Sequence, residues 1–162
     1  MIDILFIFLF GLAFGSFANV LIYRIPQEKS IISPPSTTPC CDKKIKWSDN
    51  IPLLSYLFLR GKCRYCHTSI SPIYPSIELL SGLLFVVVFL KEGIGLDFWV
   101  SSFVFLLLLS LSVIDIRYKA VPDSLNLGAL SIAIFYGLSF ETLYSALVLA
   151  GAMSLLRFYV SY

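Results

Sequence analysis

Charged side chains are scarce in this sequence. Asp, Glu, Lys and Arg make up only 14% of the residues, whereas 58% are hydrophobic. A soluble domain carries about a quarter charged residues and fewer apolar ones, so this balance excludes an ordinary soluble protein. The chain also has no internal repeat, coiled-coil heptad or low-complexity tract. We predict an all-α fold, a polytopic bundle of membrane helices with a small cysteine-containing loop.

A basic stretch in front of the first apolar run is missing as well. A secretory signal peptide has such a stretch, so we interpret residues 4–23 as an uncleaved first transmembrane helix. A spanning helix needs about 20 mostly apolar residues. The five candidate spans cover residues 4–23, 73–90, 98–114, 125–140 and 142–160. The predicted organisation is a first helix (1–23), a cysteine-containing segment (24–72) and helices two to five (73–162).

The basic residues gather in one part of the chain, residues 24–72, which we call the cysteine segment. It holds eight of the twelve Lys and Arg residues, all four cysteines and the only histidine. Cytoplasmic loops of membrane proteins are rich in Lys and Arg, and the alternation of spans puts Arg117 and Lys119 on the same side. We expect the N-terminus outside and the cysteine segment in the reducing cytoplasm, where paired cysteines favour metal over disulfides.

The cysteines have the spacing of an imperfect metal site. Cys63 and Cys66 are separated by the two residues that let both thiolates bind one ion, typically zinc. The partner pair, Cys40 and Cys41, is adjacent in sequence, so we expect one of the two to be the better ligand. His67 is a further candidate, with awkward geometry. A zinc ion here would fold the loop. The alternative is four reduced thiols in a loop held by its apolar residues.

One carboxylate stands where a long apolar run ends. Asp115 is either an ordinary helix-end residue or half of a pair of carboxylates that share a proton and activate water for peptide hydrolysis. Few partners are available: Asp123 could equally cap the next helix, Asp97 and Asp3 fall on the outer side, and Glu78 is the only other acid at this depth. The residues alone do not single out a pair.

Three motifs, in this order, resemble those of the type IV prepilin peptidases, a family of membrane aspartyl leader peptidases. They are "GLAFGSFANVLIYRIP" (11–26), "WSDNIPLLSYLFLRGKCRYCHTSISPIYPSIELLSG" (47–82) and "IDIRYKAVPDSL" (114–125). By position, Asp115 matches the first catalytic aspartate of that family. Asp123 matches a position that the family fills with Asp or Asn, which argues against it as the catalytic partner.

The resemblance implies a function at a bacterial inner membrane. Its members cut the short leader from prepilins or pseudopilins on the cytoplasmic side, so the implied partners are these substrates and the lipid bilayer, with no nucleic acid. Many members also methylate the new N-terminus, which implies S-adenosylmethionine as a cofactor where that activity is present.

Two departures from the family pattern change the expectations. The family's first cysteine pair reads Cys-Pro-x-Cys, and here Thr38 stands where its first cysteine should be, while Pro39 and Cys41 match. A zinc site would then need Cys40 as a replacement ligand.

The second departure concerns the second catalytic aspartate, which the family carries in a downstream Gly-x-Gly-Asp motif. No such motif occurs in residues 1–162, and "GIGLD" at 93–97 has the wrong spacing and precedes Asp115. We therefore expect the N-terminal part of a prepilin peptidase, with the missing motif beyond Tyr162 and no activity of this part alone. The alternative is a non-catalytic remnant or a scaffold that binds pilin leaders or assembly partners.

Overall fold

The computed structural model of the protein describes residues 2–33, 37–38, 41, 43–119 and 122–137. The longer helices are α1 (Ile2–Arg24), α3 (Ile73–Glu92), α4 (Leu96–Tyr118) and α5 (Asp123–Gly137). The cysteine segment contributes the short α2 (Leu54–Phe58) and two 3-10 helices, η1 (Ile25–Gln27) and η2 (Trp47–Asn50). Across these described ranges the structure contains isolated bridges but no strand. The predicted all-α fold class is therefore confirmed.

Within the part of the chain that the structure describes, three stretches are long and apolar enough to cross a membrane, namely Ile2–Gln27, Ile73–Glu92 and Leu96–Tyr118. They correspond to the first three predicted spans, and the chain is a membrane protein. The predicted span 125–140 begins inside α5, whose described part ends at Gly137. The predicted span 142–160 lies outside the described residues.

The third span is longer than its apolar run. We expected it to end at residue 114, but α4 continues to Tyr118. Lys119 ends the helix with a left-handed backbone (φ 51°), and its N–H donates to the Asp115 carbonyl at 2.8 Å. The polar residues continue the helical hydrogen bonds past the apolar run. Asp115 is therefore part of the last turn of α4.

Helices α1 and α3 approach each other closely because small residues line their contact. A Cβ atom on Gly15 would lie 2.7 Å from the Glu78 Cα, and one on Gly11 would lie 2.9 Å from the Gly82 Cα. The buried Ser81 hydroxyl donates to the Gly11 carbonyl at 2.8 Å. Helices in membranes associate through such close packing, since lipid tails are as apolar as the side chains. The contact joins the two helices that flank the cysteine segment.

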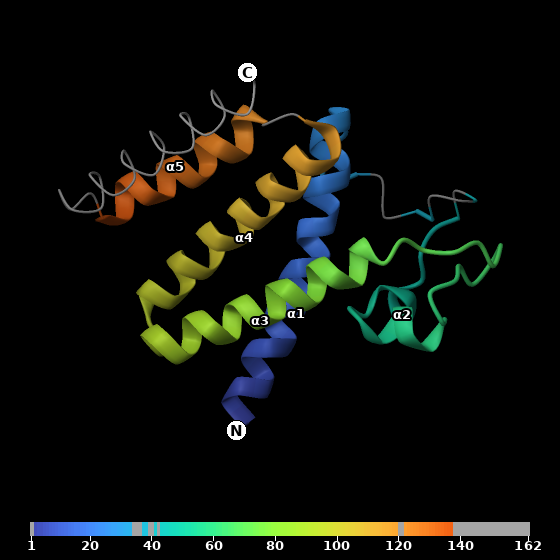
Figure 1. Ribbon diagram of the computed structural model, residues 1–162, viewed down its shortest axis with the longest axis horizontal. Helices are drawn as coiled ribbons and strands as arrows, with labels where there is room; N and C mark the ends of the chain where they lie inside the picture. The colour runs from blue at the N-terminus through green and yellow to red at the C-terminus, as the bar shows by residue number, and fades with distance from the viewer. Residues whose placement is uncertain (1, 34–36, 39–40, 42, 120–121, 138–162) are drawn as a thin grey trace, which may run out of the picture.

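Aromatic rings pack α4 against α1 and α3. Phe85 of α3 and Phe98 of α4 are fully buried, and their rings meet edge to face with centroids 6.1 Å apart. Phe14 of α1 stacks on Phe85 at 5.7 Å, and Phe10 of α1 meets Trp99 of α4 edge to face at 5.3 Å. Aromatic pairs contribute about 0.5–1.5 kcal/mol each beyond burial. Figure 1 shows the resulting bundle, with α5 beside α4.

The outer faces of these helices are also apolar. Large hydrophobic side chains that are exposed on them include Leu5, Phe6, Leu83, Val87, Leu90 and Phe105. In water such a surface would be a liability, but hydrocarbon tails are a favourable solvent for it. The bundle thus buries Gly11, Gly15 and part of its aromatic rings inside, and it presents aliphatic and other aromatic side chains to lipid.

We predict that Gly15→Ala destabilises the bundle by about 1–3 kcal/mol, the range for overpacking in a closely packed core. The added methyl group would meet backbone of α3, which cannot move aside as a flexible side chain does. Unfolding of the purified protein in detergent, followed by circular dichroism, measures the change.

The matched control is Gly128→Ala in α5, where an added Cβ has no neighbour within 4 Å. Since alanine is the better helix former by about 1 kcal/mol, this variant should be as stable as the parent or more so. Equal unfolding curves for Gly15→Ala and the parent would contradict the proposed close contact.

Candidate functional site

The larger hairpin of the cysteine segment, which we call the first hairpin although it comes later in the chain, spans residues 61–70. The Cys63 N–H donates to the Thr68 carbonyl at 2.8 Å, and the Ile70 N–H donates to the Gly61 carbonyl at 2.7 Å. The turn is closed by His67, which has a left-handed backbone (φ 57°) and donates its N–H to the Cys63 carbonyl at 3.0 Å. This tight turn brings Cys63 and Cys66 to the same end of the hairpin.

A second, smaller hairpin carries Cys41. Thr37 and Lys44 form an antiparallel bridge, and the Thr38 N–H donates to the Lys43 carbonyl at 2.9 Å. The Cys41 N–H donates to the Thr38 carbonyl at 3.4 Å. These bonds hold Cys41 beside Thr38.

The two hairpins bring three thiols together. The Sγ atoms of Cys41, Cys63 and Cys66 all lie within 4.8 Å of one another. Thiolates bound to one tetrahedral zinc, with Zn–S bonds of about 2.3 Å, are separated by about 3.8 Å. The donor set and its spacing thus suit zinc after a small adjustment. Cys40 lies outside the described residues, and His67 is exposed and does not belong to this group.

Thr38 contacts the edge of the thiol cluster. Its Oγ1 lies 3.0 Å from the Cys41 Sγ and accepts a hydrogen bond from the Lys43 N–H at 3.2 Å. The motif comparison identified position 38 only as the place where the family has a cysteine and this chain has none. In the folded segment the Thr38 hydroxyl lies at the edge of the cluster, beside the Cys41 sulfur.

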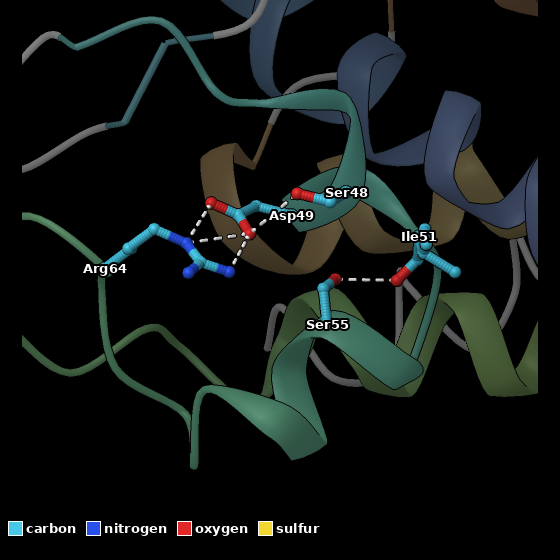
Figure 2. Close-up of polar contacts among 5 residues, drawn as sticks. All are labelled: Ser48, Asp49, Ile51, Ser55 and Arg64. Atoms are coloured by element: carbon cyan, nitrogen blue, oxygen red, sulfur yellow. Dashed lines mark hydrogen bonds and ion pairs between the residues drawn. The ribbon is translucent and has the colours of Figure 1, made fainter.

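A charge pair fastens the first hairpin to η2, as Figure 2 shows. The Arg64 Nε donates to both Asp49 oxygens at 3.0 and 2.8 Å, and its NH2 nitrogen donates to Oδ1 at 2.6 Å. The Asp49 side chain is only 8% exposed. Because the guanidinium donates to both oxygens, it holds the pKa of the Asp49 carboxyl below its ordinary value. Arg64 lies between Cys63 and Cys66, so the pair also orients the thiols.

Glu78 ties the cysteine segment to the membrane bundle. Its Oε2 accepts a hydrogen bond from the Leu53 N–H at 2.8 Å. Leu53 is the centre of a γ-turn, with φ 60° and ψ −50°, in which the Leu54 N–H donates to the Pro52 carbonyl at 2.6 Å. Such turns are rare and strained by about 1–3 kcal/mol. The carboxylate on α3 therefore holds a turn that the chain would not keep alone.

The loop ends of α1, α3 and α4 meet near Asp115. The Asp115 side chain is exposed. Two residues later, the Arg117 side chain lies close to the Tyr74 hydroxyl. The Tyr74 carbonyl in turn accepts a hydrogen bond from the Asn19 Nδ2 at 3.1 Å. Asp115 thus lies at the end of the bundle from which the cysteine segment extends.

The other acids considered with Asp115 lie elsewhere or have another role. Asp3 and Asp97 are in the first turns of α1 and α4, at the opposite end of these helices. Asp123 is the first residue of α5, and the Asn126 N–H donates to the Pro122 carbonyl at 3.2 Å. Since the capping residue is the one whose carbonyl accepts the first helical bond, Pro122 and not Asp123 has that position.

Three of these contacts could not be found from the sequence. The bonds of Asp49 to Arg64, of Glu78 to Leu53 and of Thr38 to Cys41 join residues without a shared motif. The only available signal was the position of Glu78 near the inner end of its span.

Comparison with known proteins identifies the family to which this chain is related. The family model described as the Bacterial Peptidase A24 N-terminal domain matches residues 9–92. Proteins named prepilin leader peptidase/N-methyltransferase are 39% identical in Klebsiella pneumoniae, 38% in Myxococcus xanthus and 36% in Pectobacterium carotovorum. The matches cover 92%, 88% and 92% of this chain, but 68%, 43% and 62% of the three relatives. No solved structure matches the chain.

The chain belongs to the bacterial peptidase A24 family. The resemblance inferred from the three motifs is thereby confirmed. The matched A24 domain contains most of α1, the whole cysteine segment and α3, so it includes the thiol cluster and the Glu78 contact. Asp115 follows this domain but lies within the similarity to the Klebsiella protein, which extends over 92% of the chain.

We predict that the purified A24 chain binds about one zinc ion through Cys41, Cys63 and Cys66, with Cys40 as the fourth ligand. Cys63→Ser should abolish zinc binding, since it removes a buried thiol from the cluster. Cys40→Ser should weaken binding, and adding Thr38→Cys should restore it, because position 38 already lies next to the Cys41 sulfur. Metal analysis and a competing chelator measure occupancy and affinity. Unchanged zinc content in Cys63→Ser would refute the site.

The Asp49–Arg64 pair should make the stability of the cysteine segment depend on pH. The folded pKa of Asp49 is lowered, so the pair stabilises above the ordinary carboxyl pKa of about 3.9 and is lost as pH falls through the folded value. In Asp49→Asn, the backbone amide hydrogens of residues 47–70 should exchange with solvent faster than in the parent near neutral pH. The difference should shrink below about pH 4. A difference that is constant with pH would rule out this carboxylate as its source.

Proposed function

We propose that this chain contains the first catalytic aspartate of a prepilin leader peptidase, which cleaves the leader from type IV prepilins or pseudopilins at the cytoplasmic face of the bacterial inner membrane. The observation that carries this proposal is the membership of the A24 family together with relatives named for this activity. The exposed carboxylate of Asp115 at the loop end of the bundle supports it, because peptide hydrolysis at a membrane edge needs an accessible acid there.

The proposed chemistry is that of two aspartates that share one proton. The ionised carboxylate takes a proton from water as the water oxygen attacks the scissile carbonyl carbon, and the protonated one donates its proton to the carbonyl oxygen. Proton transfer to the amide nitrogen then accompanies cleavage of the C–N bond. We assign one of these roles to Asp115. Glu78 is a poor second acid, since its Oε2 accepts the Leu53 amide.

The proposed topology follows from the distribution of charge. The cysteine segment and Arg117 carry basic side chains and lie at the same end of the bundle, which supports a cytoplasmic location for both. The N-terminus would then be outside. A reporter fused after residue 45 tests this arrangement.

For the thiol cluster we propose a structural role. Zinc, when bound by these cysteines, would supply a cross-link between the two hairpins and no redox or acid–base step. S-adenosylmethionine would be a cofactor only where the N-methyltransferase activity for which these relatives are named is present.

A second candidate function is a non-catalytic scaffold that binds pilin leaders or assembly partners. It is favoured by one observation, the absence of a Gly-x-Gly-Asp motif from residues 1–162. A cleavage assay separates the two candidates. A scaffold would bind a leader peptide without cleaving it, even when the chain under test includes sequence downstream of residue 162.

We predict that residues 1–162 alone do not cleave a prepilin leader, because the second carboxylate of the pair is not among them. In a chain that has the Gly-x-Gly-Asp segment, Asp115→Asn should abolish cleavage, since an amide of the same size cannot exchange a proton. Cleavage is measured on a prepilin in membranes.

The matched control is Asp123→Asn, which makes the same chemical change eight residues away. Asp123 is exposed in the first turn of α5, where its charge contributes at most about 1 kcal/mol through the helix dipole. This variant should retain activity. Activity in Asp115→Asn, or loss only in Asp123→Asn, would mean that the catalytic assignment is wrong.

A further inference from the structure

Helix α2 has an exposed apolar face that nothing in the proposed reaction uses. Leu54, Leu57 and Phe58 are 48%, 64% and 83% exposed and follow the helical spacing of i, i+3 and i+4, so they share one side of the helix. The opposite side faces the first hairpin, where the Tyr56 hydroxyl donates to the Ile70 carbonyl at 3.5 Å. The short helix is thus amphipathic, with its apolar face turned away from the segment that it belongs to.

The bond to Glu78 places this face at the edge of the membrane. Glu78 lies five residues into the spanning helix Ile73–Glu92, which is about 7.5 Å along its axis. Because the Leu53 N–H donates to the Glu78 carboxylate, α2 starts at the level of the first turns of α3. Figure 1 shows α2 beside this end of α3. Its exposed side chains are therefore level with the ends of helices whose own apolar faces contact lipid.

Positive charge borders the apolar face at Phe58. An open pocket joins it at Phe58 and is lined by Phe58, Leu59, Arg60, Lys62, Cys63, Arg64 and His67. Asp49 is the only acidic residue from 43 to 72, and Arg64 is its partner. The exposed Arg60 and Lys62 remain beside Phe58 as cations that an anionic group can reach. An apolar face bordered by cations at a membrane edge matches the boundary between acyl chains and anionic headgroups.

We propose that α2 is an interfacial anchor for anionic phospholipid. Leu54, Leu57 and Phe58 enter the boundary between headgroups and acyl chains, and Arg60 and Lys62 bind the lipid phosphates. Glu78 sets the depth of insertion through Leu53. The anchor holds the cysteine segment against the bilayer surface, independently of whether the chain cleaves prepilins.

The test uses the full chain with Phe58→Trp, reconstituted into nanodiscs of phosphatidylglycerol or of phosphatidylcholine with brominated acyl chains. The signal of the parent, from Trp47 and Trp99, is subtracted. We expect the added indole to be quenched about twofold more strongly in the anionic discs, since basic residues draw the helix to the anionic surface. An added indole that aqueous iodide quenches and brominated lipid does not would overturn the proposal.

Charge reversal separates pocket binding from a general effect of net charge. In the Phe58→Trp background, Lys62→Glu should reduce the preference for anionic discs, whereas Lys44→Glu should leave it unchanged, because Lys44 is exposed but does not line the pocket. Equal effects of both changes would contradict the phosphate site. Zinc content and circular dichroism verify that both variants fold.

Peptide docking is the alternative that the same probe detects. If a leader peptide shifts the emission of the added indole and the two kinds of lipid give equal quenching, the face binds peptide and the lipid proposal is wrong. Glu78→Ala should weaken the quenching of the added indole by brominated lipid, since it removes the acceptor of the Leu53 amide through which α3 sets the depth of α2.

Discussion

The loop end of the molecule depends on the backbone contact between α1 and α3 at Gly15. Any side chain there would meet the Glu78 Cα, since even a Cβ would approach it to 2.7 Å. The contact brings together two helices that are separated by the whole cysteine segment. It also turns Glu78 toward that segment, beside the Ser16 side chain of α1. The same stretch of α3 therefore both packs on α1 and binds the segment through Leu53.

Two carboxylates then fold the cysteine segment by different physical means. Asp49 forms an ion pair with Arg64 inside the segment, which fixes the hairpin that carries Cys63 and Cys66. Glu78 binds a backbone amide, which offsets the strain of the γ-turn at Leu53 and joins the segment to α3. The thiols and α2 thus keep a defined arrangement at the start of α3.

How far the sequence predicts this arrangement depends on the range of the interactions. The apolar runs predicted α1, α3 and α4, because each helix satisfies its own backbone and needs only apolar side chains to enter lipid. The end of α4 was predicted four residues early, since hydropathy stops at Ile114 while helical hydrogen bonds continue to Tyr118. The gap between Cys63 and Cys66 predicted a shared turn. The cysteine pattern and the family motif also predicted that Cys41 joins them, as the three sulfur atoms do. That the Thr38 hydroxyl lies beside Cys41 depends on a second hairpin and was not predictable from spacing.

The amino-acid sequence by itself determined the fold class, the family and the aspartate on which the proposed chemistry rests. These properties depend on composition and on local motifs, which are read along the chain. Only the tertiary structure decided that Glu78 holds the turn at Leu53 and that Arg64 pairs with Asp49. It also decided that the apolar face of α2 lies level with the start of α3. These contacts join residues 15 to 25 positions apart through the path of a folded loop, and no local pattern of side chains encodes that path.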